Sequence, residues 1–169
     1  QGGYLAGKEL CEKGCVRPLL IRDFRMASTI QQRRRGFLDA LAEYGKTCEG
    51  DYEITVLPDY KSAKERVIEF LGEKGCCFDG VFTTNDMMAL GTIHALAEAG
   101  YSVPGQVMIV GFDNVSLSEF CNPPMTTVAQ DTERMALVAG EALLKLIRKE
   151  PIEQKEYVVP VHMEVRNTT

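Results

Sequence analysis

The sequence predicts an α/β fold with a doubly wound parallel sheet, on two observations. Four amphipathic segments each close at a glycine, and a glycine just past a helix suits a left-handed C-terminal cap. Short apolar runs typical of buried parallel strands lie between these segments. The glycines are Gly14, Gly45, Gly75 and Gly100, and the runs are RPLLI (17–21), YEITVL (52–57), GVFTT (80–84) and VMIVGF (107–112). Alternating helices and strands predict a parallel sheet with helices on both faces.

Two serines mark the expected helix starts. Ser28 precedes an apolar stripe, and Ser62 is followed three residues later by Glu65, which is a capping-box arrangement. We expect both serines to be N-caps. The stripe after Ser28 consists of Ile30, Phe37, Leu41 and Tyr44.

The last third of the chain predicts one more helix and a final strand. Residues 132–148 carry apolar side chains on one side, which predicts an amphipathic helix. The stretch YVVPVHMEV (157–165) predicts a last strand, or two short strands interrupted by Pro160. The chain opens with a helix where an α/β domain normally opens with a strand, so we expect upstream sequence to be missing.

Composition indicates a compact globular domain. The chain has 169 residues, 45% of them hydrophobic, and a net charge of -5. This length suits about one domain, and the hydrophobic fraction excludes a disordered tail. The apolar runs are far shorter than the ~18 residues of a membrane span, so no membrane partner is expected. The acidic balance argues against nucleic-acid binding by this chain alone.

The six cysteines predict neither a metal site nor disulfides. They lie at positions 11, 15, 48, 76, 77 and 121, without zinc-type spacing to one another or to the two histidines. Cys11 and Cys15, one helical turn apart, would also fit a metal or redox pair, but buried free thiols are the simpler interpretation. The start of the chain has no signal-peptide pattern. We therefore expect a reducing, cytoplasmic location, with no metal, cofactor or catalytic residue.

Polar and aromatic side chains follow each predicted strand. In open parallel sheets ligands bind outside the carboxyl ends of the strands. This rim predicts a small polyhydroxylated or zwitterionic ligand, because carboxylates and amides pair with hydroxyls and aromatic rings cover sugar faces. Its members are Arg22, Asp23, Phe24, Arg25, Asp59, Tyr60, Thr84, Asn85, Asp86, Asp113 and Asn114.

Each of these residues also has a simpler interpretation. Asn85 or Asp86 would also fit a helix cap, residues 113–114 an ordinary turn, and Tyr60 a surface ring. Arg33, Arg34 and Arg35 would most simply form a solvated helix face. The helical phase nevertheless places Arg33 and Arg34 on either side of the inward direction, whereas Arg35 points away.

Six motifs in a fixed order resemble one protein family. They are GGYLAGKELCEKG (2–14), RRRGFLDAL (33–41), TNDMMALG (84–91), VPGQVMIVGFDN (103–114), PPMTTVAQ (123–130) and the closing VPVHMEVRNTT. With these motifs the chain resembles the lactose-repressor-like (LacI/GalR) family of bacterial transcription regulators. The resemblance implies a type I periplasmic-binding-protein-like fold, a flavodoxin-like strand order and no enzymatic activity.

The resemblance also implies which residues bind the effector. The positions that match the family's effector contacts are Arg33, Tyr60, Asn85 and Asp113. The stretch IRDFRMAS (21–28) departs from the family, which often has a glycine-containing loop there. Arg22 and Arg25 within it would change the charge of the pocket.

The family's two-lobed architecture implies how the chain is divided. Residues 1–126 match the C-terminal lobe, 127–150 a segment of the N-terminal lobe, and 151–169 a return to the C-terminal lobe. The DNA-binding head and most of the N-terminal lobe would be absent. The helix within 127–150 would then have an apolar face without its partner.

The family's dimer-forming region on this lobe maps to residues 88–97 and 116–121. The candidates for a homodimer interface are Leu90, Ile93, His94 and Phe120, and Leu90→Asp is expected to prevent dimerisation. His94 would also fit an isolated surface histidine.

The implied function is effector sensing in a transcription regulator. A small molecule, expected to be a sugar or a derivative, would bind between two lobes and control operator DNA binding by the missing head. The alternative is a periplasmic sugar-binding protein of a transporter or sensor system. An enzyme on a flavodoxin-like sheet is disfavoured, since the sequence has no phosphate-cradling glycine loop, nucleophile elbow or metal cluster.

Overall fold

The computed structural model describes residues 1–25, 27–48, 50–152, 154 and 156–169. Within these residues a six-stranded sheet has the order β2-β1-β3-β4-β5-β6. The first five strands are parallel, and β6 runs antiparallel to β5. This confirms the predicted parallel sheet and its flavodoxin-like order. The strands are β1 (Pro18–Asp23), β2 (Glu53–Val56), β3 (Gly80–Thr83), β4 (Met108–Asp113), β5 (Thr126–Gln130) and β6 (Val161–Glu164).

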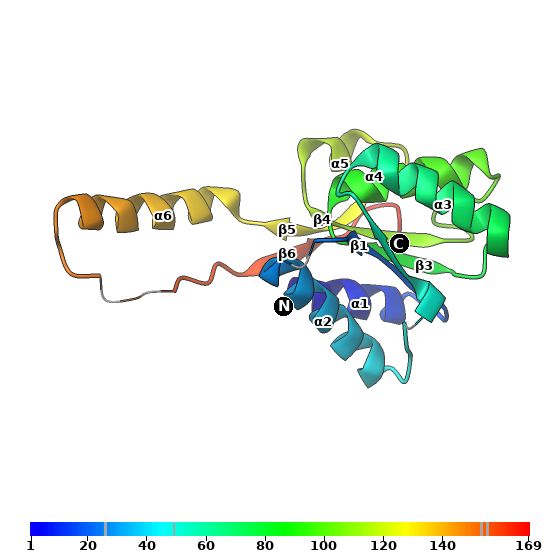
Figure 1. Ribbon diagram of the computed structural model, residues 1–169, viewed down its shortest axis with the longest axis horizontal. Coiled ribbons are helices and arrows are strands. Elements are labelled where there is room, and N and C mark those ends of the chain that lie inside the picture. Colours follow the sequence, from blue (N-terminus) through cyan, green and yellow to red (C-terminus); the bar gives the residue numbers. More distant parts are fainter. Residues whose placement is uncertain (26, 49, 153, 155) are drawn as a thin grey trace.

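Helices cover both faces of the sheet (Figure 1). On one face α1 and α2 pack against each other, and on the other face α3 packs against α4. The helices are α1 (Gly2–Glu12), α2 (Ser28–Glu43), α3 (Tyr60–Lys74), α4 (Asp86–Glu98), the short α5 (Ser116–Phe120) and α6 (Thr132–Ile147), and a 3-10 turn spans Gly50–Tyr52. None of these helices is both long and apolar enough to span a bilayer.

One hydrophobic core lies on each face of the sheet. Under α1 and α2, Phe37 packs against Phe82 with ring centroids 5.0 Å apart. Under α3 and α4, Phe70 packs against Phe78 at 5.8 Å. The sheet is therefore buried on both faces, which explains why its strands read as continuous apolar runs.

The predicted helix ends are confirmed, whereas the predicted helix starts are wrong. Gly14, Gly45, Gly75 and Gly100 all have positive φ, between 65° and 93°. Ser28 is the first residue of α2, and Ala27 occupies the N-cap without a side-chain bond. At α3 the cap is Asp59, whose carboxylate accepts a 2.8 Å bond from the Ser62 amide. The chain leaves β2 early enough for the helix to begin at Tyr60, two residues before Ser62.

All six cysteines are free, as expected from their spacing. Cys15 and Cys48 are buried in the core beneath α1 and α2. Burial raises the pKa of the Cys48 thiol to about 12, so this thiol stays protonated and unreactive. The described residues contain no cluster of three or more His, Cys, Asp or Glu side chains that could hold a metal ion.

The segment that leaves the sheet differs at both ends from the expected 127–150. Residues 127–130 belong to β5, where Thr127 pairs with Gly111 of β4. The chain rejoins the sheet only at Val161, directly after Pro160, rather than at residue 151. Between these points α6 projects away from the body of the domain (Figure 1). Proline lacks the N–H that a ladder needs, which explains the late start of β6.

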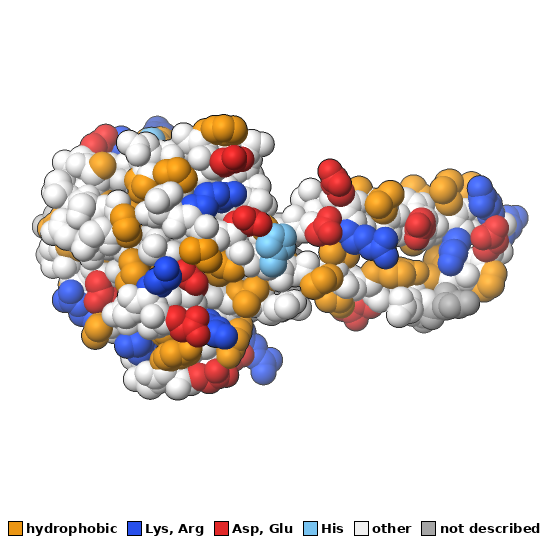
Figure 2. Space-filling model, turned by 180° about the vertical axis from the view of Figure 1, so that it is seen from behind, with side chains coloured by type: hydrophobic (Ala, Val, Ile, Leu, Met, Phe, Trp, Pro, Cys, Tyr) orange, Lys and Arg blue, Asp and Glu red, His pale blue; other side chains and the backbone are white. Residues whose placement is uncertain are grey.

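No residue of α6 is buried, so its apolar side chains are uncovered in this structure. Figure 2 shows hydrophobic side chains along the projecting part. The large exposed apolar residues of α6 are Met135, Leu137, Leu143, Leu144, Leu146 and Ile147. Contiguous exposed apolar surface of this kind marks an interaction surface.

Gly111 in β4 is required by close packing against a buried carboxylate. A Cβ at this position would lie 2.2 Å from Asp86 Oδ1 and 2.8 Å from Met125 Sδ. We expect Gly111→Ala to lower the free energy of unfolding by about 1–3 kcal/mol through overpacking. Urea denaturation with linear extrapolation measures this change in the free energy of unfolding.

The matched control is Gly72→Ala in α3, where the added Cβ meets no atom within 4 Å. We expect this control to be neutral or to stabilise by up to about 1 kcal/mol. Equal stability of the Gly111→Ala variant and the wild type would contradict the packing argument.

Candidate functional site

Arg33 of α2 and Asp113 at the end of β4 meet at the carboxyl edge of the sheet. Arg33 Nη2 lies 3.5 Å from Asp113 Oδ1, and Arg33 Nη1 donates to the Thr84 carbonyl at 2.5 Å. The guanidinium stacks 3.5 Å from the centroid of the Phe112 ring. The Arg33 side chain is only 17% exposed. The inward direction predicted for Arg33 is thus observed, and the arginine has a carboxylate partner.

The turn after β4 directs the Asp113 side chain into this site. Asp113 and Asn114 have φ values of 117° and 53°, which side-chain-bearing residues seldom adopt and which cost free energy. Gln130 Nε2 donates to Asp113 Oδ1 at 2.7 Å, and Arg166 donates to Asn114 Oδ1 at 2.8 Å. The positive φ values agree with the expected change of chain direction at residues 113–114, whereas the ligand role of Asp113 stays a prediction.

Burial perturbs the charges of the pair. It raises the pKa of Asp113 to about 6, an effect that Arg33 opposes and Asp86 reinforces. Burial also lowers the pKa of Arg33, although an arginine stays protonated in proteins. At neutral pH Asp113 is mainly ionised, so the site offers a carboxylate acceptor beside the Arg33 guanidinium, which covers the buried Phe112 ring. Carboxylates and guanidinium groups both form hydrogen bonds with hydroxyls.

Asn85 acts as the N-cap of α4, which was the simpler of its two interpretations. Its Oδ1 accepts from the Met88 amide at 2.8 Å, and its Nδ2 donates to the Pro58 carbonyl at 3.1 Å. Asp86 is not the cap, since its carboxylate is turned into the protein. It accepts from Thr127 Oγ1 at 2.6 Å and from the Val115 amide at 2.9 Å.

Tyr60 is turned toward α4 rather than toward the Arg33–Asp113 pair. Its hydroxyl forms a 2.8 Å hydrogen bond with His94 Nδ1, and the two rings meet edge to face with centroids 5.4 Å apart. The structure therefore joins a predicted ligand residue to a predicted interface residue. His94 is exposed but not isolated.

The four interface candidates differ in what they can offer a partner. Leu90 and Ile93 are only 8% and 2% exposed, because they pack into the core beneath α3 and α4. Phe120 is 78% exposed. Leu90→Asp would bury a carboxylate and is expected to unfold the domain, so it cannot report on dimerisation as first expected.

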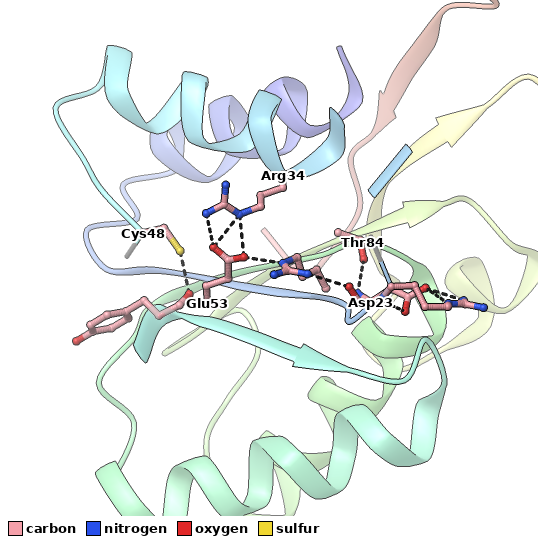
Figure 3. Close-up of polar contacts among 8 residues, drawn as sticks. Asp23, Arg34, Cys48, Glu53 and Thr84 are labelled. Atoms are coloured by element: carbon pink, nitrogen blue, oxygen red, sulfur yellow. Dashed lines mark hydrogen bonds and ion pairs between the residues drawn. The ribbon is translucent and has the colours of Figure 1, made fainter. Parts of the chain in front are cut away.

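An arginine network beside the site was only partly foreseen. Glu53 Oε1 accepts from Arg22 Nε at 2.6 Å and from Arg34 Nε at 2.8 Å, and Figure 3 shows Arg34 lying over this carboxylate. The Thr84 hydroxyl accepts a 3.3 Å bond from the Asp23 amide. The sequence singles out Arg22 by its charge and Arg34 by its helical phase. No sequence pattern indicates that Glu53 is their partner, because that role depends on how α2 lies over β2.

Gln130 was also missed as a partner of Asp113. It closes the PPMTTVAQ motif, but the sequence alone did not predict the strand β5 that carries it. The pairing of Asp113 with Ala129 across β4 and β5 brings the neighbouring Gln130 side chain to the carboxylate. The strand signal was present in the β-branched residues Thr126, Thr127 and Val128.

Comparison with known proteins identifies the family. The model of the family described as "Periplasmic binding protein-like domain" matches residues 8–169. The chain belongs to this family. The HTH-type transcriptional repressor PurR of Aliivibrio salmonicida is 32% identical over 171 residues, which cover 98% of this chain and 49% of PurR. The chain spans about half the length of the curated relatives it matches.

Solved structures of LacI-family regulators share this fold. The chain matches the transcriptional regulator CelR in complex with cellobiose with a TM-score of 0.92 and 29% identity, over 99% of this chain and 51% of CelR. A LacI-family regulator of Enterococcus faecium with bound ribose matches with a TM-score of 0.85 and 30% identity, over 99% of this chain and 62% of that one. The predicted LacI/GalR resemblance and the periplasmic-binding-protein-like fold are confirmed.

The pKa of Asp113 predicts how the stability of the domain depends on pH. The folded-state value of about 6 lies above the ordinary value of 3.8, so the folded protein holds this proton more tightly than the unfolded chain. The contribution of Asp113 to the free energy of unfolding therefore falls as pH rises from about 4 to about 6.

We expect the wild type to lose on the order of 1–3 kcal/mol relative to Asp113→Asn across this range. Urea titrations of both proteins at several pH values measure the difference. Two stability curves that run parallel from pH 4 to 6.5 would contradict the burial of this carboxylate.

Proposed function

We propose that this chain is the effector-sensing domain of a LacI/GalR-type transcription regulator and that its effector is a sugar or sugar derivative. The observation that carries the proposal is the Arg33–Asp113 pair beside Phe112 at the carboxyl edge of the sheet. The family match and the repressor relatives support the same function. The cellobiose and ribose bound to similar regulators support a carbohydrate effector.

The proposed mechanism is a ligand-dependent reorientation of two lobes. This chain would supply one lobe, and the uncovered apolar face of α6 would pack in the other. The effector would bind between them and favour one orientation, to the extent that its affinity differs between the two. A DNA-binding head carried by the same protein would then change its affinity for operator DNA. The site of action is the cytoplasm, and the domain performs no catalysis.

The repressor relatives favour this function over a periplasmic sugar-binding protein, the alternative with the same fold. The six free cysteines agree with a reducing compartment. Within the proposal Arg33 and Asp113 contact the effector directly. Tyr60 is hydrogen-bonded to His94, and Asn85 to Met88 and Pro58. These two side chains would contact the effector only if the present hydrogen bonds break or if the same atoms form additional bonds to the effector.

Effector binding is expected to depend on the Asp113 carboxylate. A panel of neutral sugars, sugar phosphates and sugar acids is first screened by thermal shift, and dissociation constants of the hits are then measured by calorimetry. We expect Asp113→Asn to weaken binding about 10–100-fold, because a charged acceptor contributes about 1.5–3 kcal/mol to a hydrogen bond.

The control for this measurement is Asp39→Asn, at an exposed carboxylate on α2 that pairs with Arg35. It is expected to bind each sugar as the wild type does. A panel with no hit, or hits unaffected by Asp113→Asn, would refute the proposed site.

Homodimerisation is proposed to use the exposed part of the predicted surface, namely Phe120 and His94. We expect Phe120→Asp to shift the protein from dimer to monomer in sedimentation velocity, because it places a charge within an apolar contact. The monomer should keep its fold, as its far-UV circular dichroism would show, since Phe120 is exposed. A dimer that survives this substitution would contradict the surface.

A further inference from the structure

A small pocket lined with arginines lies between α2 and the outer strands of the sheet. Its volume is about 120 Å³, and its lining residues are Arg22, Arg25, Ile30, Gln31, Arg34 and Glu53. A water molecule takes up about 30 Å³, so the pocket has room for about four waters. A group of five heavy atoms, such as a phosphate, fits this space.

Positive charge exceeds negative charge around this pocket. Arg22 and Arg34 share the single carboxylate of Glu53, with contacts of 2.6 to 2.9 Å. The carboxylate of Asp23 is already paired with Arg25 at 2.6 Å. Three guanidinium groups therefore face two carboxylates among the residues described here. An arginine cannot discharge by losing its proton, so the excess favours a further anion.

The two arginines keep donors for that anion. Arg22 donates from Nε to Glu53 and from Nη1 to the Asp23 carbonyl at 3.1 Å. Arg34 uses Nε and Nη2 for Glu53. The other guanidinium N–H groups match the bidentate geometry of a phosphate or carboxylate. The first turn of α2 carries no acidic residue and no side-chain cap, so its dipole adds to the positive potential.

The pocket and the Arg33–Asp113 site are linked by hydrogen bonds through the buried residues Thr84 and Asp23. Thr84 accepts from Arg33 through its carbonyl and from the Asp23 amide through its hydroxyl. Arg22 in turn donates to the Asp23 carbonyl. Figure 3 shows Asp23 and Thr84 next to each other, with one more side chain between them and the Glu53–Arg34 pair. This series of hydrogen bonds connects the site at Asp113 with the arginines of the pocket.

We propose that the effector is an anionic sugar, and that Arg22 and Arg34 hold its phosphate or carboxylate group. Glu53 is the internal competitor that occupies the two guanidinium groups when no effector is bound. The sugar part of this inference rests on the proposed function, whereas the anion pocket is a property of the chain itself.

The pocket is tested with inorganic phosphate, titrated into the chain by calorimetry at constant ionic strength set with chloride. We expect Arg34→Gln to weaken phosphate binding about tenfold, because one charge-assisted contact is lost. Glu53→Gln should strengthen binding about fivefold or more, because the competing carboxylate is removed. Arg35→Gln is the matched control on α2, since Arg35 is exposed and pairs with Asp39 on the same helix. It should leave phosphate binding unchanged.

The opposite signs of the two variants separate ligand binding from a structural role. A purely structural Glu53–Arg34 pair would make both variants weaken binding together, which would overturn the proposal. So would a wild-type chain that does not bind phosphate, or an equal loss in Arg35→Gln.

A second titration series compares a sugar phosphate, a sugar acid and their neutral parent sugar. Tighter binding of either anionic form, lost in Arg34→Gln, supports the proposal and tells phosphate from carboxylate. Neutral and anionic sugars that bind equally, with dependence on Asp113 but not on Arg34, would overturn it while leaving the proposed function intact. Phosphate binding through Arg34 without any sugar binding would support the pocket and refute the proposed function.

Discussion

The buried carboxylate of Asp86 is the interaction on which the carboxyl edge of the sheet depends. Asp86 is 1% exposed, and a buried carboxylate is tolerated only when hydrogen bonds replace its lost water. Thr127 of β5 and the amide of Val115 supply these bonds. The same carboxylate lies against Gly111, which explains why β4 has no side chain there. One residue at the start of α4 thereby ties together two strands and the turn that carries Asp113.

This anchoring accounts for the strained turn after β4. The backbone of Asp113 and Asn114 is held at positive φ from both sides, by the Asp86–Val115 bond and by Arg166, which reaches Asn114 from the C-terminal segment. Arg166 also donates to the Met125 carbonyl at 2.8 Å. The surrounding bonds offset the cost of the conformation. Asp113 is therefore presented to Arg33 by a rigid frame, which favours specific binding because little ordering remains to be done.

Charge is arranged along this edge as a chain of linked pairs. Asp113 and Arg33 lead through Thr84 and Asp23 to Arg22, Glu53 and Arg34. Each carboxylate in this series of linked pairs contacts an arginine or another hydrogen-bond donor. At the Arg34 end of the series, however, arginines outnumber carboxylates. In contrast, α6 carries its apolar residues into solvent. The domain thus has one polar edge with excess positive charge and one segment whose apolar side chains are exposed.

The sequence by itself determined the features that depend on neighbouring residues. Helix ends at the four glycines, the apolar strands and the parallel sheet follow from local conformational preference and periodicity, and the motif order identified the family. Tertiary structure alone decided the rest. Whether Asp59 or Ser62 capped α3 depended on where the chain leaves β2, and whether residues 127–130 stayed in the sheet depended on pairing with β4. The partners of Tyr60, Arg34 and Asp86 lie 34, 19 and 41 residues away in sequence. Such pairs form only when packed elements meet, so no local pattern encodes them.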